Sequence, residues 1–137
     1  MPGAGLRFAP PTIPAMTQTL VDQAGVEALL ALQQPAWLLK HSNACPISFA
    51  ALDAFNAYLG AHADEPAGLL VIQEQRPLSN WVATRLSRVH QSPQLFLLAG
   101  GKAVWMATHW GITVEAMTAA RSAVIAKSQK ADPETAP

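Results

Sequence analysis

Short apolar runs alternate with segments of helical periodicity along this chain, and that alternation restricts the fold more than any other feature of the sequence. Runs of consecutive apolar residues a few positions long are typical of strands buried on both faces of a sheet. On this basis we predict strands at residues 36–39, 68–72, 94–98 and 102–108.

Between these runs, apolar residues recur at three- or four-residue steps, as on the buried face of an amphipathic helix. This periodicity predicts helices at residues 21–33, 46–62 and 77–86. Pro46 opens the second helix, a position where proline is favoured because its missing N–H would be unpaired there. A final helix is expected from a Thr113 cap to about Lys127.

The order of these elements predicts their pairing. A helical crossover makes the first two strands parallel, and Gly100–Gly101 suits the tight hairpin that makes the last two antiparallel. The result is an α/β protein with a mixed four-stranded sheet and helices on both faces, which is the arrangement of the thioredoxin fold. A small ferredoxin-like sandwich is the alternative, but it needs a strand where this chain begins with a predicted helix.

Composition fits one folded domain, expected over residues 18–128. Half of the 137 residues are apolar and 13% are charged, enough for a single buried core. The proline-rich residues 1–17 are expected to form a flexible tail, and residues 129–137 a disordered one. Met16 is a second candidate for the start of translation beside Met1, because recognisable patterning begins just after it.

Charge and cysteine content exclude several classes of protein. Nine basic and nine acidic residues cancel, and no stretch supplies the basic face that nucleic acids select. No apolar run approaches the ~18 residues of a membrane span. One cysteine and four scattered histidines do not make a zinc site, so we expect no bound metal. A lone thiol favours a reducing compartment, and we expect a cytoplasmic protein.

The lone cysteine, Cys45, is the candidate nucleophile. It follows the first predicted strand and directly precedes Pro46, at the amino end of a helix. A thiolate there faces unpaired N–H groups and the positive end of the helix dipole, which lowers thiol pKa values. Lys40 and His41 just upstream add positive potential. A buried, inert cysteine is the alternative, but turns at the carboxyl edge of a sheet are exposed, which favours a reactive thiol.

Two serines define how such a thiol would work. Ser48 stands where a Cys-x-x-Cys pair has its second cysteine, so the chemistry must follow a monothiol route. Its hydroxyl either donates to the Cys45 thiolate or satisfies backbone N–H groups, and both roles stay open. Ser92–Pro93 directly precedes a strand; in a thioredoxin fold this proline would be cis, would face the thiol, and would leave the Ser92 backbone free to pair with an extended substrate.

Three further residues are candidates for binding a thiol substrate. His109 and Trp110 close the fourth strand and are expected near Cys45, where they would form a wall of the thiol-binding groove. For Trp110 the favoured interpretation is instead a tryptophan that covers the core. Arg76 begins the helix after the second strand, where it would either hold a carboxylate of a small thiol or remain solvated.

Residues 40–48, Lys-His-Ser-Asn-Ala-Cys-Pro-Ile-Ser, resemble the Lys-His-Ser-x-x-Cys-Pro-Ile-Ser block of the monothiol bacilliredoxins, the YtxJ-like proteins of the bacillithiol system. Three more blocks agree in order: Arg-Pro-Leu-Ser-Asn at 76–80, His-Gln-Ser-Pro-Gln at 90–94, and Gly-Lys-Ala-Val-Trp at 101–105 running to His109–Trp110. The resemblance covers about residues 21–120. Ala44 replaces a frequent threonine of the family, and Gly111 a common acidic residue.

The resemblance implies a thioredoxin-like fold and thiol–disulfide exchange with bacillithiol, a cysteinyl-glucosaminyl-malate thiol that acts as co-substrate rather than bound cofactor. The implied partners are S-bacillithiolated proteins, from which Cys45 would remove the bacillithiol by becoming S-bacillithiolated itself. A second bacillithiol or another reductant would then regenerate the thiol. Because the malate is anionic, Lys40, Arg76 and His109 are candidate contacts.

Other functions stay open at this point. A non-catalytic thioredoxin-fold adaptor or redox sensor would use Cys45 for a regulatory mixed disulfide or a covalent homodimer. A glutathione-dependent monothiol glutaredoxin would use the same thiol with a different co-substrate, and two copies sharing an iron–sulfur cluster through Cys45 are conceivable. For the leading function we expect a monomer or a weak dimer.

Overall fold

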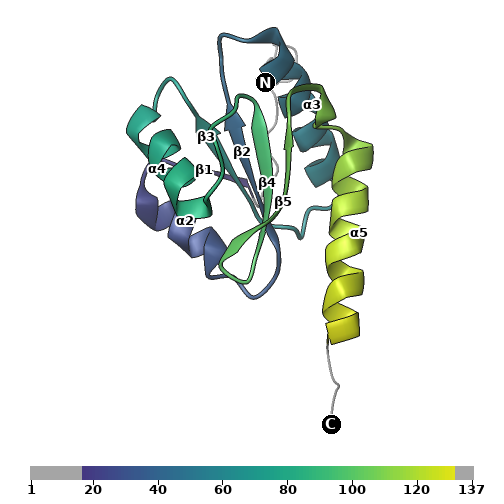
Figure 1. Ribbon diagram of the computed structural model, residues 1–137. Coiled ribbons are helices and arrows are strands. Elements are labelled where there is room, and N and C mark those ends of the chain that lie inside the picture. Colours follow the sequence, from purple (N-terminus) through teal and green to yellow (C-terminus); the bar gives the residue numbers. More distant parts are fainter. Residues whose placement is uncertain (1–16, 132–137) are drawn as a thin grey trace, which may run out of the picture.

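The four predicted apolar runs are strands of one sheet in the computed structural model, which describes residues 17–131 (Figure 1). Helices α2, α3 and α4 fall between strands, and the β4–β5 hairpin leads through a short 3-10 helix, η1, into α5. In chain order the elements are β1 (Thr17–Thr19), α2 (Gln23–Leu30), β2 (Ala36–His41), α3 (Pro46–Ala61), β3 (Ala67–Val71), α4 (Arg76–Leu86), β4 (Gln94–Ala99), β5 (Lys102–Thr108), η1 (His109–Gly111) and α5 (Val114–Ala131).

The strands are arranged in the order β1-β3-β2-β4-β5. As predicted, β2 and β3 are parallel, and β4 and β5 form an antiparallel hairpin through two glycines with positive φ, Gly100 and Gly101. β4 also pairs antiparallel with β2, so the sheet is mixed. The pairing of β4 with β5 shifts register between Leu97 and Leu98, as at a β-bulge.

The sheet has five strands, and the prediction of four was wrong. The additional strand is β1, with the polar sequence Thr-Gln-Thr, which pairs parallel with residues 67–69 of β3 at the sheet edge. Such a short polar segment carries no apolar period, and its first residue, Thr17, falls within the tail predicted over residues 1–17. A strand does therefore open the described chain, but the element order and the helices on both faces of the sheet differ from the ferredoxin-like alternative, which has the order β-α-β-β-α-β and helices on one face.

Helix ends also differ from the prediction. α2 begins at Gln23, because Asp22 caps it by accepting a hydrogen bond from the Gly25 N–H at 2.9 Å, and it ends at Leu30, short of the predicted residue 33. Thr113 caps α5 as expected, accepting from the Ala116 N–H at 3.0 Å. α5 continues to Ala131, so the first residues of the predicted C-terminal tail are helical. The remainder of both predicted tails, residues 1–16 and 132–137, lies outside the described residues.

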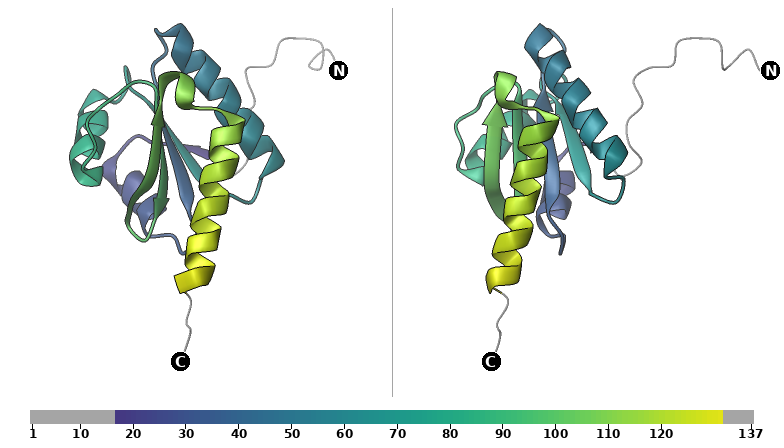
Figure 2. Two further views of the ribbon diagram at one scale, coloured as in Figure 1. Left: turned by 45° about the vertical axis from the view of Figure 1, so that its right-hand side comes forward. Right: turned by 90° about the vertical axis from the view of Figure 1, so that its right-hand side faces the viewer.

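Helices flank both faces of the sheet (Figure 2), and between them and the sheet lie two apolar layers. Alternate residues of a strand point to opposite faces, and β2 divides accordingly: Ala36 and Leu38 pack under α2 and α4, whereas Trp37 and Leu39 pack under α3 and α5. All six residues of β2 are buried, including the polar pair Lys40 and His41 at its carboxyl end. The central strand is therefore covered on both faces and paired on both edges.

A glycine of β3 allows the first helix to approach the sheet closely. A Cβ atom on Gly68 would lie 2.6 Å from Leu20 Cδ1 and 2.7 Å from Leu29 Cδ1, both in the apolar layer on the α2 side. These separations are well inside van der Waals contact. The layer can therefore reach its observed packing only with glycine at this position.

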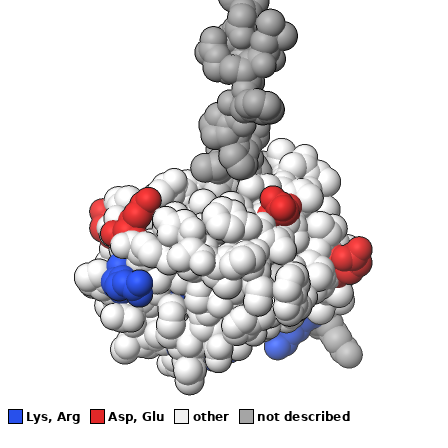
Figure 3. Space-filling model, turned by 90° about the horizontal axis from the view of Figure 1, so that it is seen from above, with Lys and Arg blue, Asp and Glu red and all other residues white. Residues whose placement is uncertain are grey.

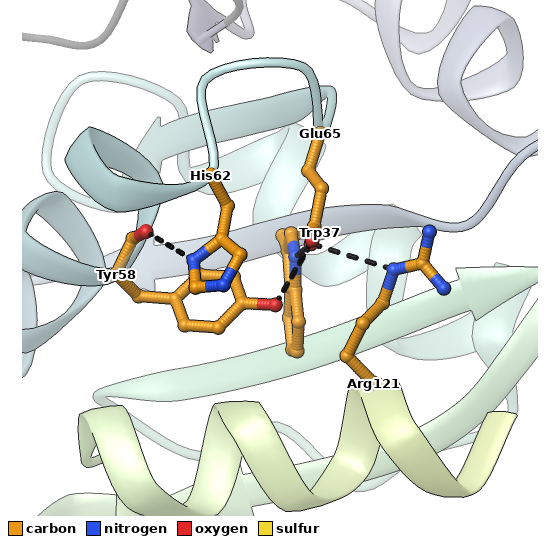
Figure 4. Close-up of polar contacts among 5 residues, drawn as sticks. All are labelled: Trp37, Tyr58, His62, Glu65 and Arg121. Atoms are coloured by element: carbon orange, nitrogen blue, oxygen red, sulfur yellow. Dashed lines mark hydrogen bonds and ion pairs between the residues drawn. The ribbon is translucent and has the colours of Figure 1, made fainter. Parts of the chain in front are cut away.

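The buried carboxylate of Glu65 connects elements of the apolar layer between the sheet and helices α3 and α5 (Figure 4). Glu65, in the loop between α3 and β3, accepts hydrogen bonds from Trp37 Nε1 at 2.8 Å and from the Tyr58 hydroxyl at 3.0 Å. Arg121 Nε of α5 lies 3.5 Å from the same carboxylate, an ion pair too long for a strong hydrogen bond. Burial, reinforced by the neighbouring Glu65, raises the pKa of Tyr58, so its hydroxyl stays a donor. One side chain thus connects β2, α3 and α5.

We predict that Glu65→Leu lowers the free energy of unfolding by about 3 kcal/mol, because it leaves the buried Trp37 and Tyr58 donors without an acceptor. Urea unfolding followed by fluorescence measures the change. Adding Trp37→Phe to Glu65→Leu removes one orphaned donor, so the second substitution should destabilise less in that background than in the wild type. Additive losses would contradict the role assigned to the Trp37–Glu65 bond.

Gly68→Ala should destabilise the protein by about 1–3 kcal/mol, because the new methyl overpacks the layer between β3 and α2. Gly60→Ala near the end of α3 is the matched control, since a Cβ there meets no atom within 4 Å. Alanine is the better helix former, and the control should be neutral or gain a few tenths of a kcal/mol. Thermal unfolding of both variants tests the difference; equal midpoints would refute the close approach.

Candidate active site

Cys45 occupies the N-cap position of α3, directly after the loop that leaves β2, and is partly exposed. Its backbone is extended (φ −124°, ψ 121°), and its carbonyl accepts the first helical bond from the Ser48 N–H at 3.0 Å. Pro46 takes the first helical turn, as predicted. The side chain of Cys45 makes no capping hydrogen bond, so the thiol lies at the amino end of the helix dipole without being used as a cap.

The loop that carries the thiol is held by side-chain hydrogen bonds from a neighbouring loop. Gln73, between β3 and α4, donates from Nε2 to Ser42 Oγ at 2.7 Å and accepts at Oε1 from the Asn43 N–H at 3.1 Å. Ser42 Oγ also accepts from the Ala44 N–H at 3.3 Å. Residues 42–44 are thereby fixed immediately before Cys45. This role of Gln73 could not be predicted, because a single glutamine outside any motif carries no signal.

Ser48 also holds residues 42–44, and we call the hydrogen bonds of Gln73, Ser42 and Ser48 to this loop the clamp. Its side chain is completely buried, and its Oγ accepts from the Ser42 N–H at 3.3 Å. Of the two roles left open by the sequence, the contacts in the structure are those of a hydroxyl that satisfies a backbone N–H. That N–H belongs to the thiol-bearing loop rather than to the first turn of α3.

The Ser92–Pro93 peptide bond is cis and lies at the same edge of the sheet as Cys45. The pairing sets this position, because Lys40 at the end of β2 is opposite Gln94 at the start of β4. Gln94 in turn holds the preceding loop, donating to the Val89 carbonyl at 2.9 Å and accepting from the Gln91 N–H at 3.2 Å. The segment leading into Pro93 is therefore as firmly tethered as the one leading into Cys45.

His109 and Trp110 reach this edge through β5, whose Thr108 is opposite Gln94. His109 adopts a left-handed backbone (φ 52°), a conformation that is uncommon outside glycine, and its N–H donates to the Pro93 carbonyl at 3.1 Å. Trp110 is 70% exposed, so it does not cover the core. Topology thus brings the ends of β2 and β5 and the start of β4 together, as the sequence predicted (Figure 1).

The two residues predicted to add positive potential, Lys40 and His41, do not reach the surface. Lys40 is 0% exposed, and burial lowers its pKa to about 8. His41 packs edge-on against Phe49 with its ring centroid 5.1 Å away, and burial lowers its pKa against a smaller opposing effect from the Ser48 backbone. Both side chains follow β2 into its apolar layers, because the strand continues two residues past the predicted end at Leu39.

Seen from above, the face that carries this edge consists mostly of uncharged side chains, with the charged ones scattered over it (Figure 3). Arg76, at the first residue of α4, is exposed. Within residues 17–131 no three His, Cys, Asp or Glu side chains gather in a way that would hold a metal ion. No helix in that range is both long and apolar enough to cross a membrane.

Gln73→Ala should speed amide hydrogen exchange at Asn43 and Ala44, because the loop loses its two bonds to Gln73 and opens locally more often. The stability loss should be about 1 kcal/mol, the usual value of such bonds. Exchange followed by NMR reports each amide. The exposed neighbour substitution Glu74→Ala is the control and should leave both amides unchanged; unchanged exchange in Gln73→Ala itself would show that the clamp does not restrain the loop.

Comparison with known proteins adds to this geometry. A family model described as monothiol bacilliredoxin BrxC matches residues 18–117. Among solved structures, a thioredoxin-fold protein proposed to be an oxidoreductase is 32% identical, with a TM-score of 0.72 over 77% of this chain and 93% of its own.

More distant matches share the fold alone. A thioredoxin variant from Halobacterium salinarum is 14% identical with a TM-score of 0.62, over 82% of this chain and 93% of its own. Thioredoxin f from spinach chloroplasts is 15% identical with a TM-score of 0.65, over 83% of this chain and 97% of its own. The predicted thioredoxin-like fold class is therefore confirmed.

Proposed function

The chain belongs to the monothiol bacilliredoxin BrxC family, and from this premise we propose that it removes bacillithiol from S-bacillithiolated proteins by thiol–disulfide exchange at Cys45. The family and the thioredoxin-fold neighbour at 32% identity support a thiol oxidoreductase-like role. The observation that carries the finer proposal is the position of the chain's single cysteine, partly exposed at the N-cap of α3 beside the cis Ser92–Pro93 bond.

The first half-reaction transfers bacillithiol to the protein. The Cys45 thiolate attacks the bacillithiol sulfur of a mixed disulfide, a new S–S bond forms, and the old one breaks. The client cysteine leaves as a thiolate and takes a proton from water. Negative charge on the attacking sulfur is favoured by the amino end of α3. The clamp formed by Gln73, Ser42 and Ser48 keeps the thiol in one position before attack.

The second half-reaction restores the thiol. Because Ser48 stands where a resolving cysteine would be, no internal thiol can attack the new disulfide. A second bacillithiol attacks the bacillithiol sulfur bound to Cys45, releasing the Cys45 thiolate and bacillithiol disulfide. Net, one free bacillithiol is consumed for each client thiol released, and the disulfide bond passes from the client to a pair of bacillithiol molecules, one of which came from the client. Another thiol reductant able to reach the mixed disulfide would serve in the same way.

Substrate contacts are assigned to the residues at the sheet edge. The Ser92 backbone precedes the paired part of β4, which begins at Gln94, and suits pairing with an extended client segment. Trp110 and His109 form the wall on the β5 side, and Pro46 the wall on the α3 side. Arg76, exposed at the start of α4, is the candidate for a malate carboxylate.

Cys45→Ser should abolish release of bacillithiol from an S-bacillithiolated client, because the attacking sulfur is lost. Mass spectrometry of both partners follows the transfer, and the wild type should gain the mass of one bacillithiol while the client loses it. Gly60→Ala, on the surface of α3 away from its amino end, is the active control. Faster exchange with an S-glutathionylated client would favour a glutaredoxin, and no transfer with either client would favour the adaptor.

A further inference from the structure

A buried lysine connects the central strand to the loop before the cis peptide bond. Lys40 is completely buried at the end of β2, and its Nζ lies 3.0 Å from Nδ1 of His90, in the loop between α4 and β4. Ser79 Oγ of α4 lies 3.4 Å from the same ring nitrogen. His90 itself is exposed. Neither His90 nor Ser79 was a predicted site residue.

This contact determines which nitrogen of His90 carries the proton. A charged lysine ammonium has three donors and no acceptor, so Nδ1 of His90 must accept. The pKa of Lys40, lowered by burial to about 8, leaves the amine charged at neutral pH. A neutral imidazole whose Nδ1 accepts carries its proton on Nε2. Lys40 therefore makes the other edge of the exposed ring a hydrogen-bond donor.

The ring is also held neutral by its surroundings. Burial lowers the pKa of His90, and the positive charges of Lys40 and Arg76 lower it further. The ion pairs found in residues 17–131, Arg85 with Glu27 and Arg121 with Glu65, involve none of these three basic residues. Lys40, Arg76 and the Nε2–H of His90 thus lie near the amino end of α4, at the edge of the sheet that carries Cys45. Within residues 17–131, no carboxylate forms an ion pair with them.

We propose that His90, together with Arg76, binds a carboxylate of the small thiol that exchanges with Cys45, and that Lys40 is a positioning residue acting through His90. The Nε2–H of His90 supplies a neutral donor, and the Arg76 guanidinium supplies charge and paired N–H groups that match a carboxylate. The amino end of α4 adds the favourable end of its dipole. The inference rests on the proposed function, since it assigns part of that substrate site.

Anion binding can be tested without any thiol chemistry. NMR of the full chain carrying Cys45→Ser reads the His90 tautomer from its ring nitrogens and follows a titration with malate. We expect the Nε2-protonated tautomer, mixed tautomers after Lys40→Met, and saturable shifts at His90 and Arg76 with malate but not with its neutral diamide. Arg88→Ala, which removes a guanidinium bonded instead to the Ala103 carbonyl, should bind malate unchanged.

Kinetics then separates the subsite from the reaction. His90→Phe should raise the KM for bacillithiol about tenfold or more, the usual effect of losing a hydrogen bond to a charged group, with kcat and the rate with uncharged 2-mercaptoethanol unchanged. Lys40→Met keeps the ring and should raise the same KM less. An Nδ1-protonated His90, or no response to malate in a protein that exchanges bacillithiol, overturns the subsite alone. Malate binding in a protein that does not exchange bacillithiol would support the subsite and contradict the proposed function.

Discussion

The complete burial of β2 is the constraint on which the rest of the structure depends. A strand covered on both faces and paired on both edges leaves little water for its polar groups, so these groups need partners inside the protein, and His41 Nδ1 is a described atom of the strand that has none. Trp37 Nε1 donates to Glu65, Lys40 Nζ lies against His90, and the Ser42 N–H that follows the strand donates to Ser48. These partners come from three separate segments, and together they fix α3 and the loop before β4 relative to the strand.

The parts of the fold that were predictable are those with local causes. Apolar runs and helical periods place β2 to β5 and the helices between them, and Asp22 and Thr113 cap helices by hydrogen bonds within one turn. β1 has no such cause: three polar residues become a strand only because β3 offers a free edge. The last residues of α5 could not be predicted to be helical for a similar reason. Their sequence is polar, but they continue a helix that its first turns have already nucleated.

The candidate site divides in the same way. Topology alone brings Cys45, Pro93 and Trp110 to one edge of the sheet, because the strand order fixes which ends meet. The burial of Lys40 and His41 was not predictable from residue type, since both are usually solvated. Gln73 and His90 act through side-chain bonds to residues 31 and 50 positions away in the chain. His90 begins one of the blocks that resemble the bacilliredoxins, but neither residue's type nor its spacing indicates which distant side chain it contacts. Such contacts become visible only when the backbone is known.

The two margins of the sheet have a consequence for how this protein behaves at high concentration. An unpaired strand edge is a template for another chain. Here one margin is the three-residue β1, and the other is β5, whose ladder with β4 changes register at Leu97/Leu98. Within residues 17–131, β1 is short and the pairing of the seven-residue β5 is interrupted, so neither margin is a long, regular template for edge-to-edge pairing. The protein can therefore expose Trp110 at the edge of the sheet that carries Cys45 while neither margin of the sheet favours pairing with another chain.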